Sequence, residues 1–311
     1  MAKLSFLQLT NRVLRRLSRA DVTDVTALTG QAQIAADAIN EAQKALFAES
    51  TNWYSLYKTR IFTTAKIAAT TISFADADPD TISDSGSALV TSGFEAGMEI
   101  HVTGSTSNDG TYSIASGGVA AGVLTLQTAD KLTTEAAGDS VVVTAYTHPV
   151  PSDFGRTIDI TSITNNLTLI EGYGRSFDEF DPNMDSTSTI TEFVVQGDNY
   201  RFAPIPSAAT KLRERYWAIP TALSANTDTS DLPVECENCL IQWAWAEVLR
   251  YINSFDKADR VEAKFNRMLA LAKVANDKRL DKMKVLQPNS NRNSLRVPRL
   301  PVEYGFRGGF Y

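Results

Sequence analysis

Apolar residues recur with helical spacing at both ends of the chain. Between Ser5 and Arg19, they fall on one stripe at intervals of three and four residues. The same spacing predicts three further helices, over residues 31–50, from about 233 to 251 and from about 256 to 285. Only Asn253-Ser254-Phe255 separates the last two, so we expect them to form an antiparallel hairpin.

The middle of the chain changes to short runs of β-forming residues. One group lies within residues 67–147, where Gly, Ser, Asn and Asp separate the runs and Asn108-Asp109-Gly110 is a turn signal. Its runs cover residues 70–74, 98–103, 111–115, 123–126 and 140–146. A second group lies outside this segment, at residues 59–64, 157–163, 167–171, 189–196, 200–203 and 211–218. Gly197-Asp198-Asn199 has the composition of a hairpin turn between two of them.

This order of elements predicts an α+β protein. The N-terminal helices and the C-terminal hairpin form a helical bundle with a β-strand layer, and a small all-β barrel or sandwich of five or six strands is inserted between them. We expect a core from residues 1–66 and 148–285, an inserted β module at 67–147, and an extended arm at 286–311.

The net charge of −6 is unevenly distributed along the 311 residues. Residues 75–145 hold ten acids and one base, a charge of −9, which leaves +3 for the rest of the chain. This contrast supports a separate, acidic β module. A sequence pI near 5.1 is far below that of most nucleic-acid-binding domains.

Composition is that of a soluble globular protein, with 43% hydrophobic and 21% charged residues. No apolar run approaches the roughly 20 residues of a membrane span, and the N-terminus lacks a signal-peptide cleavage pattern. Two cysteines do not make a disulfide framework, so we expect the chain to fold in a cytoplasm.

The pair Cys236 and Cys239 has C-x-x-C spacing. A zinc site needs two more ligands, and a thioredoxin-like pair follows a strand, whereas this pair begins a predicted helix. We therefore favour packing in the core, with redox or zinc chemistry as the alternative.

Two acidic groups could support chemistry. The first group is Asp76, Asp78, Asp80 and Asp84. It imitates the start of a calcium loop, but Thr81 and Ser87 stand where that loop needs Gly and Glu, so a solvated acidic turn is favoured over a calcium site of another geometry.

The second group is Asp178, Glu179, Asp181 and Asp185. It could supply paired carboxylates for glycoside hydrolysis, but surface loops commonly have this composition.

No catalytic motif accompanies the two histidines, His101 and His148, and no phosphate-binding loop is present. The sequence thus predicts no catalytic residue, no cofactor and no metal site. The protein is expected not to be an enzyme.

Four arginines form a stripe nearly opposite the apolar face of the first helix: Arg12, Arg15, Arg16 and Arg19. A protein interface and a solvated face are equally favoured. Contact with DNA is third, because the stripe lacks interleaved aromatic residues.

The last twenty-five residues combine helix-blocking prolines with aromatic residues and arginines. Aromatic and Arg side chains commonly anchor interfaces, whereas disordered tails are usually poor in aromatics. We expect this segment to dock onto another subunit, with a frayed terminus as the alternative. The candidate contact residues are Leu295, Arg296, Arg299, Leu300, Tyr304, Phe306, Arg307, Phe310 and Tyr311.

Several strings, taken in order, resemble the head–tail adaptor (connector) proteins of tailed bacteriophages, including tail-tubular-A-like and tail-accessory-factor proteins. Residues 9–17 and 38–43, followed by Asn52-Trp53, are similar to that family's first two helices. Residues 150–154 resemble its L-P-x-D-F step, with Val150 in place of Leu. Further similarity lies in residues 202–206, Tyr216-Trp217 and Leu232-Pro233.

The resemblance implies a structural virion protein at the head–tail junction, assembled in the host cytoplasm. It implies a ring, commonly of twelve copies, that joins the portal protein of a DNA-filled head to tail, nozzle and fibre proteins. DNA would pass through the channel without sequence-specific binding, and no membrane is involved. Family C-termini often bind the portal, which gives the arm a partner.

Two other functions stay open. The β module, whose Gly104–Ile114 resembles an insertion in phage structural proteins, could bind a host glycan or a tail fibre. A decoration that only widens the ring or fills a gap against adjacent tail proteins is preferred, since Phe94 and Tyr112 are expected in the module's core. The third candidate is a cell-wall hydrolase.

Overall fold

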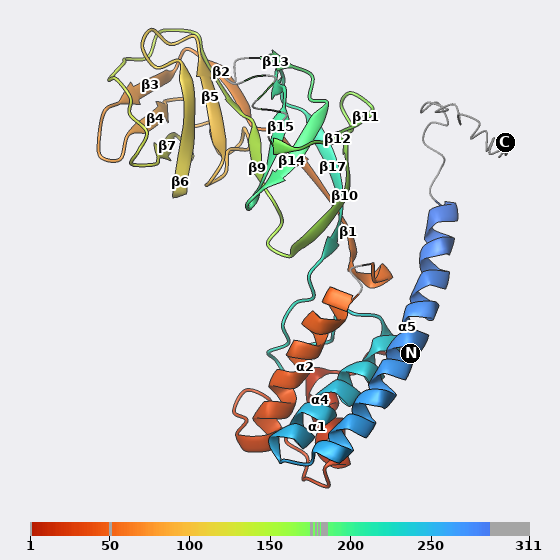
Figure 1. Ribbon diagram of the computed structural model, residues 1–311. Helices are drawn as coiled ribbons and strands as arrows, with labels where there is room; N and C mark the ends of the chain where they lie inside the picture. The colour runs from red at the N-terminus through yellow and green to blue at the C-terminus, as the bar shows by residue number, and fades with distance from the viewer. Residues whose placement is uncertain are drawn as a thin grey trace, which may run out of the picture.

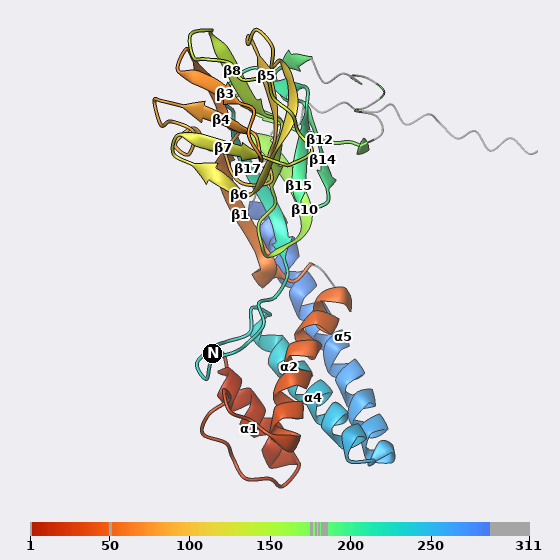
Figure 2. The ribbon, with the colours of Figure 1, turned by 90° about the vertical axis from the view of Figure 1, so that its left-hand side faces the viewer.

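The computed structural model describes residues 2–49, 52–174, 177, 179, 181 and 186–286, with side chains described as far as residue 280. The molecule is elongated, with a helical bundle at one end and β-sheets at the other (Figures 1 and 2). The predicted α+β class is confirmed.

Four helices form the bundle: α1 (Phe6–Arg16), α2 (Gly30–Glu49), α4 (Glu237–Tyr251) and α5 (Phe255–Leu286). Helix α4 is central and contacts the other three. Two short 3-10 helices, η1 (Tyr54–Leu56) and η2 (Val234–Cys236), lie where the chain leaves and re-enters the bundle. All four helices were predicted, with boundaries shifted by a few residues.

Helix α1 shows how local sequence sets these boundaries. Ser5 and Gln8 form a capping box, in which the Ser5 hydroxyl accepts from the Gln8 backbone N–H and the Gln8 side chain accepts from that of Ser5. Phe6, Leu9 and Val13 are buried. The helix ends at Arg16, earlier than predicted, and Ser18 adopts a left-handed backbone with φ of 56°.

Helices α4 and α5 form the predicted antiparallel hairpin. At 1.5 Å per residue, the 32 residues of α5 span about 48 Å, more than twice the length of α4. Ala272 and Leu280 still pack against the bundle's cluster, and the end of α5 reaches past the other helices toward the level of the β-sheets (Figure 1).

The predicted β layer consists of two four-stranded sheets. The first has the order β1 (Tyr57–Thr63), β17 (Lys211–Ala218), β10 (Phe154–Ser162) and β11 (Leu167–Thr168). The second has the order β12 (Ile170–Glu171), β14 (Glu192–Gln196), β15 (Asn199–Ala203) and β9 (Thr147–Pro149). A two-stranded pair adds β13 (Thr187–Ser188) and β16 (Ile205–Pro206).

One hydrophobic cluster joins the two sheets of this layer. It takes Ile160 and Leu212 from the first sheet and Phe193, Tyr200 and Phe202 from the second. The predicted turn also forms, because Gln196 pairs with Asn199 across Gly197-Asp198. Gly197 has a φ of 58°, which glycine adopts readily.

The β module is a single sheet of seven strands with a cluster of its own. The strand order is β2 (Lys66–Ala69), β8 (Val141–Ala145), β5 (Glu99–Thr103), β6 (Gly110–Ala120), β7 (Val123–Leu126), β4 (Thr81–Asp84) and β3 (Ile72–Ala75). Side chains from both halves of the sheet share one core, including Phe74, Ile82, Ile100 and Val143.

Strand β6 provides the bend that lets the sheet fold over this core. Its first residues pair with β5, and from Ile114 onward it pairs with β7 across a register shift. Gly117 has a φ of 73°, and a Cβ on Gly118 would lie 2.5 Å from the Thr125 carbonyl oxygen. Glycines therefore permit a bulged corner at this point.

Of the two predicted forms, barrel or sandwich, a closed barrel does not form, because the edge strands β2 and β3 do not pair with each other. The module differs from the prediction in its strand number: it has seven strands rather than five or six, since β2 and β4 were not predicted as separate strands. Both are four residues long and contain few large apolar side chains.

Candidate functional site

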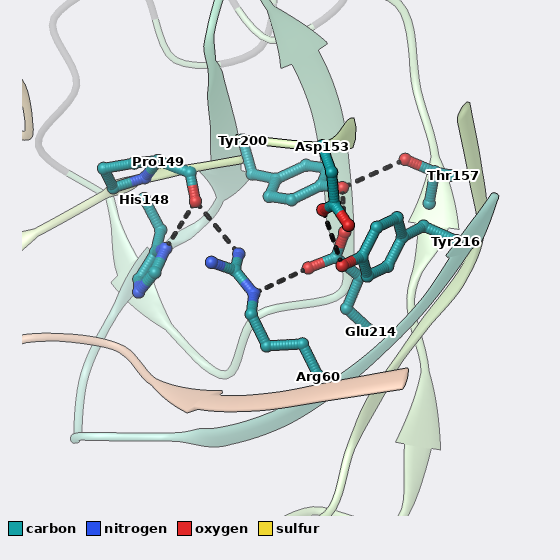
Figure 3. A network of polar contacts seen from close by, with 8 residues as sticks. All are labelled: Arg60, His148, Pro149, Asp153, Thr157, Tyr200, Glu214 and Tyr216. Atoms are coloured by element: carbon teal, nitrogen blue, oxygen red, sulfur yellow. Dashed lines mark hydrogen bonds and ion pairs between the residues drawn. The ribbon is translucent and has the colours of Figure 1, made fainter. Parts of the chain in front are cut away.

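A buried polar network joins the two sheets of the β layer (Figure 3). Glu214 is fully buried at its centre and accepts hydrogen bonds from the Tyr200 hydroxyl and from Arg60 Nε, the latter at 3.0 Å. The Arg60 guanidinium also donates to the Pro149 carbonyl at 2.9 Å. Three strands and the end of a fourth thus meet at one carboxyl group.

Strand register places these groups together. Arg60 on β1 and Glu214 on β17 are directly paired across the antiparallel ladder, so both point to the same face. Tyr200 reaches them from β15 of the facing sheet, and its hydroxyl lies 3.3 Å from that of Thr157. Burial raises the pKa of Glu214 above its ordinary range, although Tyr200 and Arg60 oppose the shift.

A second carboxylate lies beside the first (Figure 3). Asp153 Oδ1 accepts from the Tyr216 hydroxyl at 2.9 Å, and Oδ2 accepts from Lys58 Nζ at 2.5 Å. Burial opposes ionisation of Asp153, but these hydrogen bonds outweigh it and hold its pKa below the ordinary range. Burial, together with the hydrogen bond to Asp153, raises the pKa of Tyr216 to about 12.

His148, which the sequence left without a role, borders this network. Its Nδ1 lies 2.9 Å from the Pro149 carbonyl oxygen, and its ring packs on Phe62 at a centroid distance of 4.1 Å. Burial lowers the pKa of His148 to about 4, so the ring is neutral near pH 7.

The network is suited to holding strands together. Glu214 is enclosed and already accepts from two protein donors, so its arrangement stabilises the layer. The three strings that resembled adaptor proteins in this region meet here: Asp153 bonds Tyr216, and Phe154 packs edge-on against Tyr200, next to Phe202.

The arginines of the first helix have different surroundings. Arg15 pairs with Asp21, and Arg19 Nε donates to Gln31 Oε1 at 2.9 Å. Arg16 is half-buried and lies 5.3 Å from the centre of the Trp245 ring on α4. It also faces Gln242, whose side-chain amide places its oxygen toward Arg16 and there accepts hydrogen bonds from the Arg16 guanidinium. Arg12 is exposed.

The two cysteines are buried at the start of α4 in the bundle core. Burial raises the pKa of both thiols, that of Cys239 to about 11. A protonated, enclosed thiol is a poor nucleophile and a poor metal ligand. Their surroundings match the packing interpretation.

The acidic turn of the β module is only partly solvated, which corrects the prediction. Asp80 and Asp84 are buried and accept hydrogen bonds from backbone N–H groups, Asp80 from Leu132 and Asp84 from Gly86 and Ala88. Asp76 and Asp78 are exposed. Within the described ranges, no group of three metal-ligating side chains gathers.

Other predicted residues divide between the described and undescribed parts of the chain. Phe94 is buried in the module's core as expected, whereas Tyr112 is half-buried, packs against that core and donates to the Asn108 carbonyl at 3.0 Å. Asp178, Asp185 and the nine candidate contact residues of the arm lie outside the described residues. Among the helices described, none is both long enough and apolar enough to cross a membrane.

These features describe a helical bundle that carries a cross-braced β layer and an added β module. A family model described as SU10 adaptor protein matches residues 119–292, and the chain belongs to this family. It is therefore a phage adaptor protein, a structural component of the virion. No curated protein matches the chain.

The match includes the strings at Val150–Phe154, Phe202–Pro206 and Tyr216–Trp217, but not those in α1 and α2. It begins at Val119 and so includes β7 and β8 of the module. The resemblance is confirmed for a phage adaptor, whereas the tail-tubular-A-like subtype stays a prediction.

Proposed function

We propose that this chain is the head–tail adaptor of a tailed phage, without catalytic activity. Copies of it form a ring, of twelve by analogy with the family, that joins the portal to the tail and continues the DNA channel. The observation that carries this proposal is the adaptor-family match over 119–292, which spans the β layer except β1, and the α4–α5 hairpin.

The division of the chain into a core, a β module and an arm suggests a separate role for each segment. We assign ring formation to residues 1–66 and 148–285, and docking to the arm at 286–311. Its partner is the portal or an adjacent subunit. Helix α5 supports this assignment, because its C-terminal end projects beyond the other helices of the bundle (Figure 1) and the arm follows Leu286 in the sequence. Tail, nozzle and fibre proteins are the proposed partners on the other side.

The β module at 67–147 is assigned to widening the ring or filling a gap beside tail proteins. Host binding by the module lacks a supporting observation in the described residues, since Phe94 is buried and Tyr112 packs half-buried against the module's core. Among the described large hydrophobic residues of the module, Val90 is the exposed one, at 51%.

The experiment that tests this function compares the full chain with a chain lacking residues 290–311. Purified heads that carry the portal but no adaptor are incubated with each protein and sedimented. We expect the truncated chain to keep its circular dichroism spectrum and thermal transition but to be absent from the pelleted heads.

A matched variant keeps the arm's length and replaces its aromatic anchors, Tyr304, Phe306, Phe310 and Tyr311, by Ser. We expect this variant to behave like the truncation, because buried aromatic anchors dominate interface energies. If the truncated chain sediments with heads as well as the full chain does, the arm is not the docking element. If the full chain itself does not bind heads, the adaptor proposal is wrong.

A further inference from the structure

The outward face of α5 carries a continuous stripe of exposed side chains. Its positions alternate by four and three residues, which places them in line along one side of a helix. They are Arg260, Lys264, Arg267, Leu271, Val274 and Lys278. Leu271 and Val274 are 65% and 53% exposed, so two apolar residues lie among four cations.

None of these four cations forms an ion pair with another described residue. Neighbouring bases on α5 behave differently, because Lys273 pairs with Glu49 and Arg279 pairs with Glu235. Asp259 and Asp277 are exposed on the adjacent side of the helix. The stripe is therefore a basic strip with an apolar middle and open hydrogen-bonding capacity.

The opposite side of the bundle is acidic. It consists of the outward face of α2 and the loop at 219–232, which Asn40 ties to α2 by accepting from the Leu223 N–H at 2.8 Å. Asp24 and Lys3 adjoin this loop, because Asp24 accepts from Asn226 and Lys3 donates to the Ser230 carbonyl. The face holds two bases, Lys3 and Lys44, and five acids, Asp24, Asp37, Glu41, Asp228 and Asp231. Backbone N–H groups of Ala225 and Ser224 hold the pKa of Asp228 below its ordinary range.

These two faces point to different sides of the molecule. Helix α4 lies between α2 and α5 and contacts both, and Figure 1 shows α2 and α5 on opposite sides of it. A surface that complements another surface elsewhere on the same chain gives a head-to-tail contact, which closes into a ring when the rotation permits.

We propose that the α5 stripe of one copy docks on the acidic α2 face of the next copy. This inference rests on the proposed ring function and adds the surface through which the ring forms. Opposite charges set the register and speed the encounter, and burial of Leu271 and Val274 stabilises the contact. Helix–helix packing of this kind leaves the β module and the arm available for other partners.

Charge reversal tests the proposal on the full chain. One variant carries Lys264→Glu and Arg267→Glu, a second carries Asp37→Lys and Glu41→Lys, and a third carries all four changes. We expect each two-site variant to associate more than about tenfold more weakly than the wild type, because like charges then face each other. The four-site variant should recover, and so should an equimolar mixture of the two defective variants.

Association is measured by native mass spectrometry of the concentrated protein and by counting the copies bound to portal-bearing heads. A matched pair tests the apolar part: Val274→Asp should weaken association, whereas Val90→Asp, at 51% exposure on the β module, should not. Raising the salt from about 0.1 M to about 1 M shortens the Debye length from roughly 10 Å to 3 Å and should reduce association.

Two outcomes separate this surface from the function on which it rests. Folded two-site variants that associate like the wild type, or a four-site variant that does not recover, would overturn the α5–α2 contact while leaving the adaptor function intact. A wild-type chain that neither associates nor binds heads would overturn both.

Discussion

Replacing Arg60 by Met tests whether the buried network holds the β layer together. Met keeps the apolar stem and removes the guanidinium that donates to Glu214 and to the Pro149 carbonyl. The Glu214 side chain is 0% exposed and that of Arg60 is 27% exposed, so water does not readily replace the lost donor. The Tyr200 hydroxyl remains as the one network donor to Glu214.

Breaking a buried ion pair by removing one partner costs about 3–5 kcal/mol, because the other charge stays buried. We expect a value near the lower limit of this range at pH 7, since Tyr200 still donates. A loss of about 3 kcal/mol lowers a transition by roughly 6–12 °C in a domain of 150–250 residues.

The stability lost in Arg60→Met should depend on pH. Burial raises the pKa of Glu214 above its ordinary 4.5, so the folded protein binds this proton more tightly than the unfolded chain does. Its contribution to stability is therefore present at low pH and is lost as the pH rises through the raised value. Loss of Arg60 removes a cation that lowers the pKa of Glu214. The Arg60→Met variant should therefore lose more stability at pH 7 than at pH 5.

Thermal and urea unfolding of the wild type, Arg60→Met, Glu214→Gln and the combined variant at pH 5 and pH 7 provide the measurement. The combined variant should be more stable than Arg60→Met alone, because no buried carboxylate is then left unpaired. Additive losses, or a loss from Arg60→Met that is equal at both pH values, would refute the assignment of a buried ionic pair.

Three further predictions concern the rest of the fold. Gly118→Ala should destabilise the β module by about 2 kcal/mol or more in thermal unfolding, since its Cβ would lie 2.5 Å from the Thr125 carbonyl oxygen, whereas Gly117→Asn has open space and should cost less. Ser5→Ala should cost about 1 kcal/mol through loss of the α1 capping box, as measured by urea unfolding; an unchanged midpoint would contradict this role. Cys236 and Cys239 should resist a thiol reagent at pH 8 in the native protein and react after unfolding, and prompt native labelling would contradict their burial.

Sequence periodicity predicted the elements that carry strong, local signals. Strands β7 and β17 were predicted with their observed boundaries, and all four helices were found from their apolar stripes. Strands β2 and β4 were missed because Lys66–Ala69 and Thr81–Asp84 offer too few large apolar residues. The division of the β layer into two sheets depends on long-range pairing, such as Tyr200 with His148, which periodicity does not encode.

The buried network was also missed, although one signal for it was present. In β17, alternation places Leu212, Glu214 and Tyr216 on one face, so a carboxylate occupies a position flanked by buried residues. A charge at such a position requires a buried partner, and Arg60 on the paired strand supplies it. The arginine stripe shows the converse limit, because helical spacing alone did not reveal that Arg16 packs on Trp245.

The dipeptide Tyr216-Trp217 explains how the bundle and the β layer can act as one body. Tyr216 bonds Asp153 inside the layer, while Trp217 belongs to the bundle's hydrophobic cluster and packs edge-on against Tyr57 at 5.8 Å. The two bodies also approach closely at Gly155, where a Cβ would lie 2.6 Å from the Phe47 ring of α2. The neighbouring side chains of Tyr216 and Trp217 therefore contact the β layer and the bundle, respectively. A contact on α2 or α5 would then fix the position of the β layer as well, as the proposed ring requires.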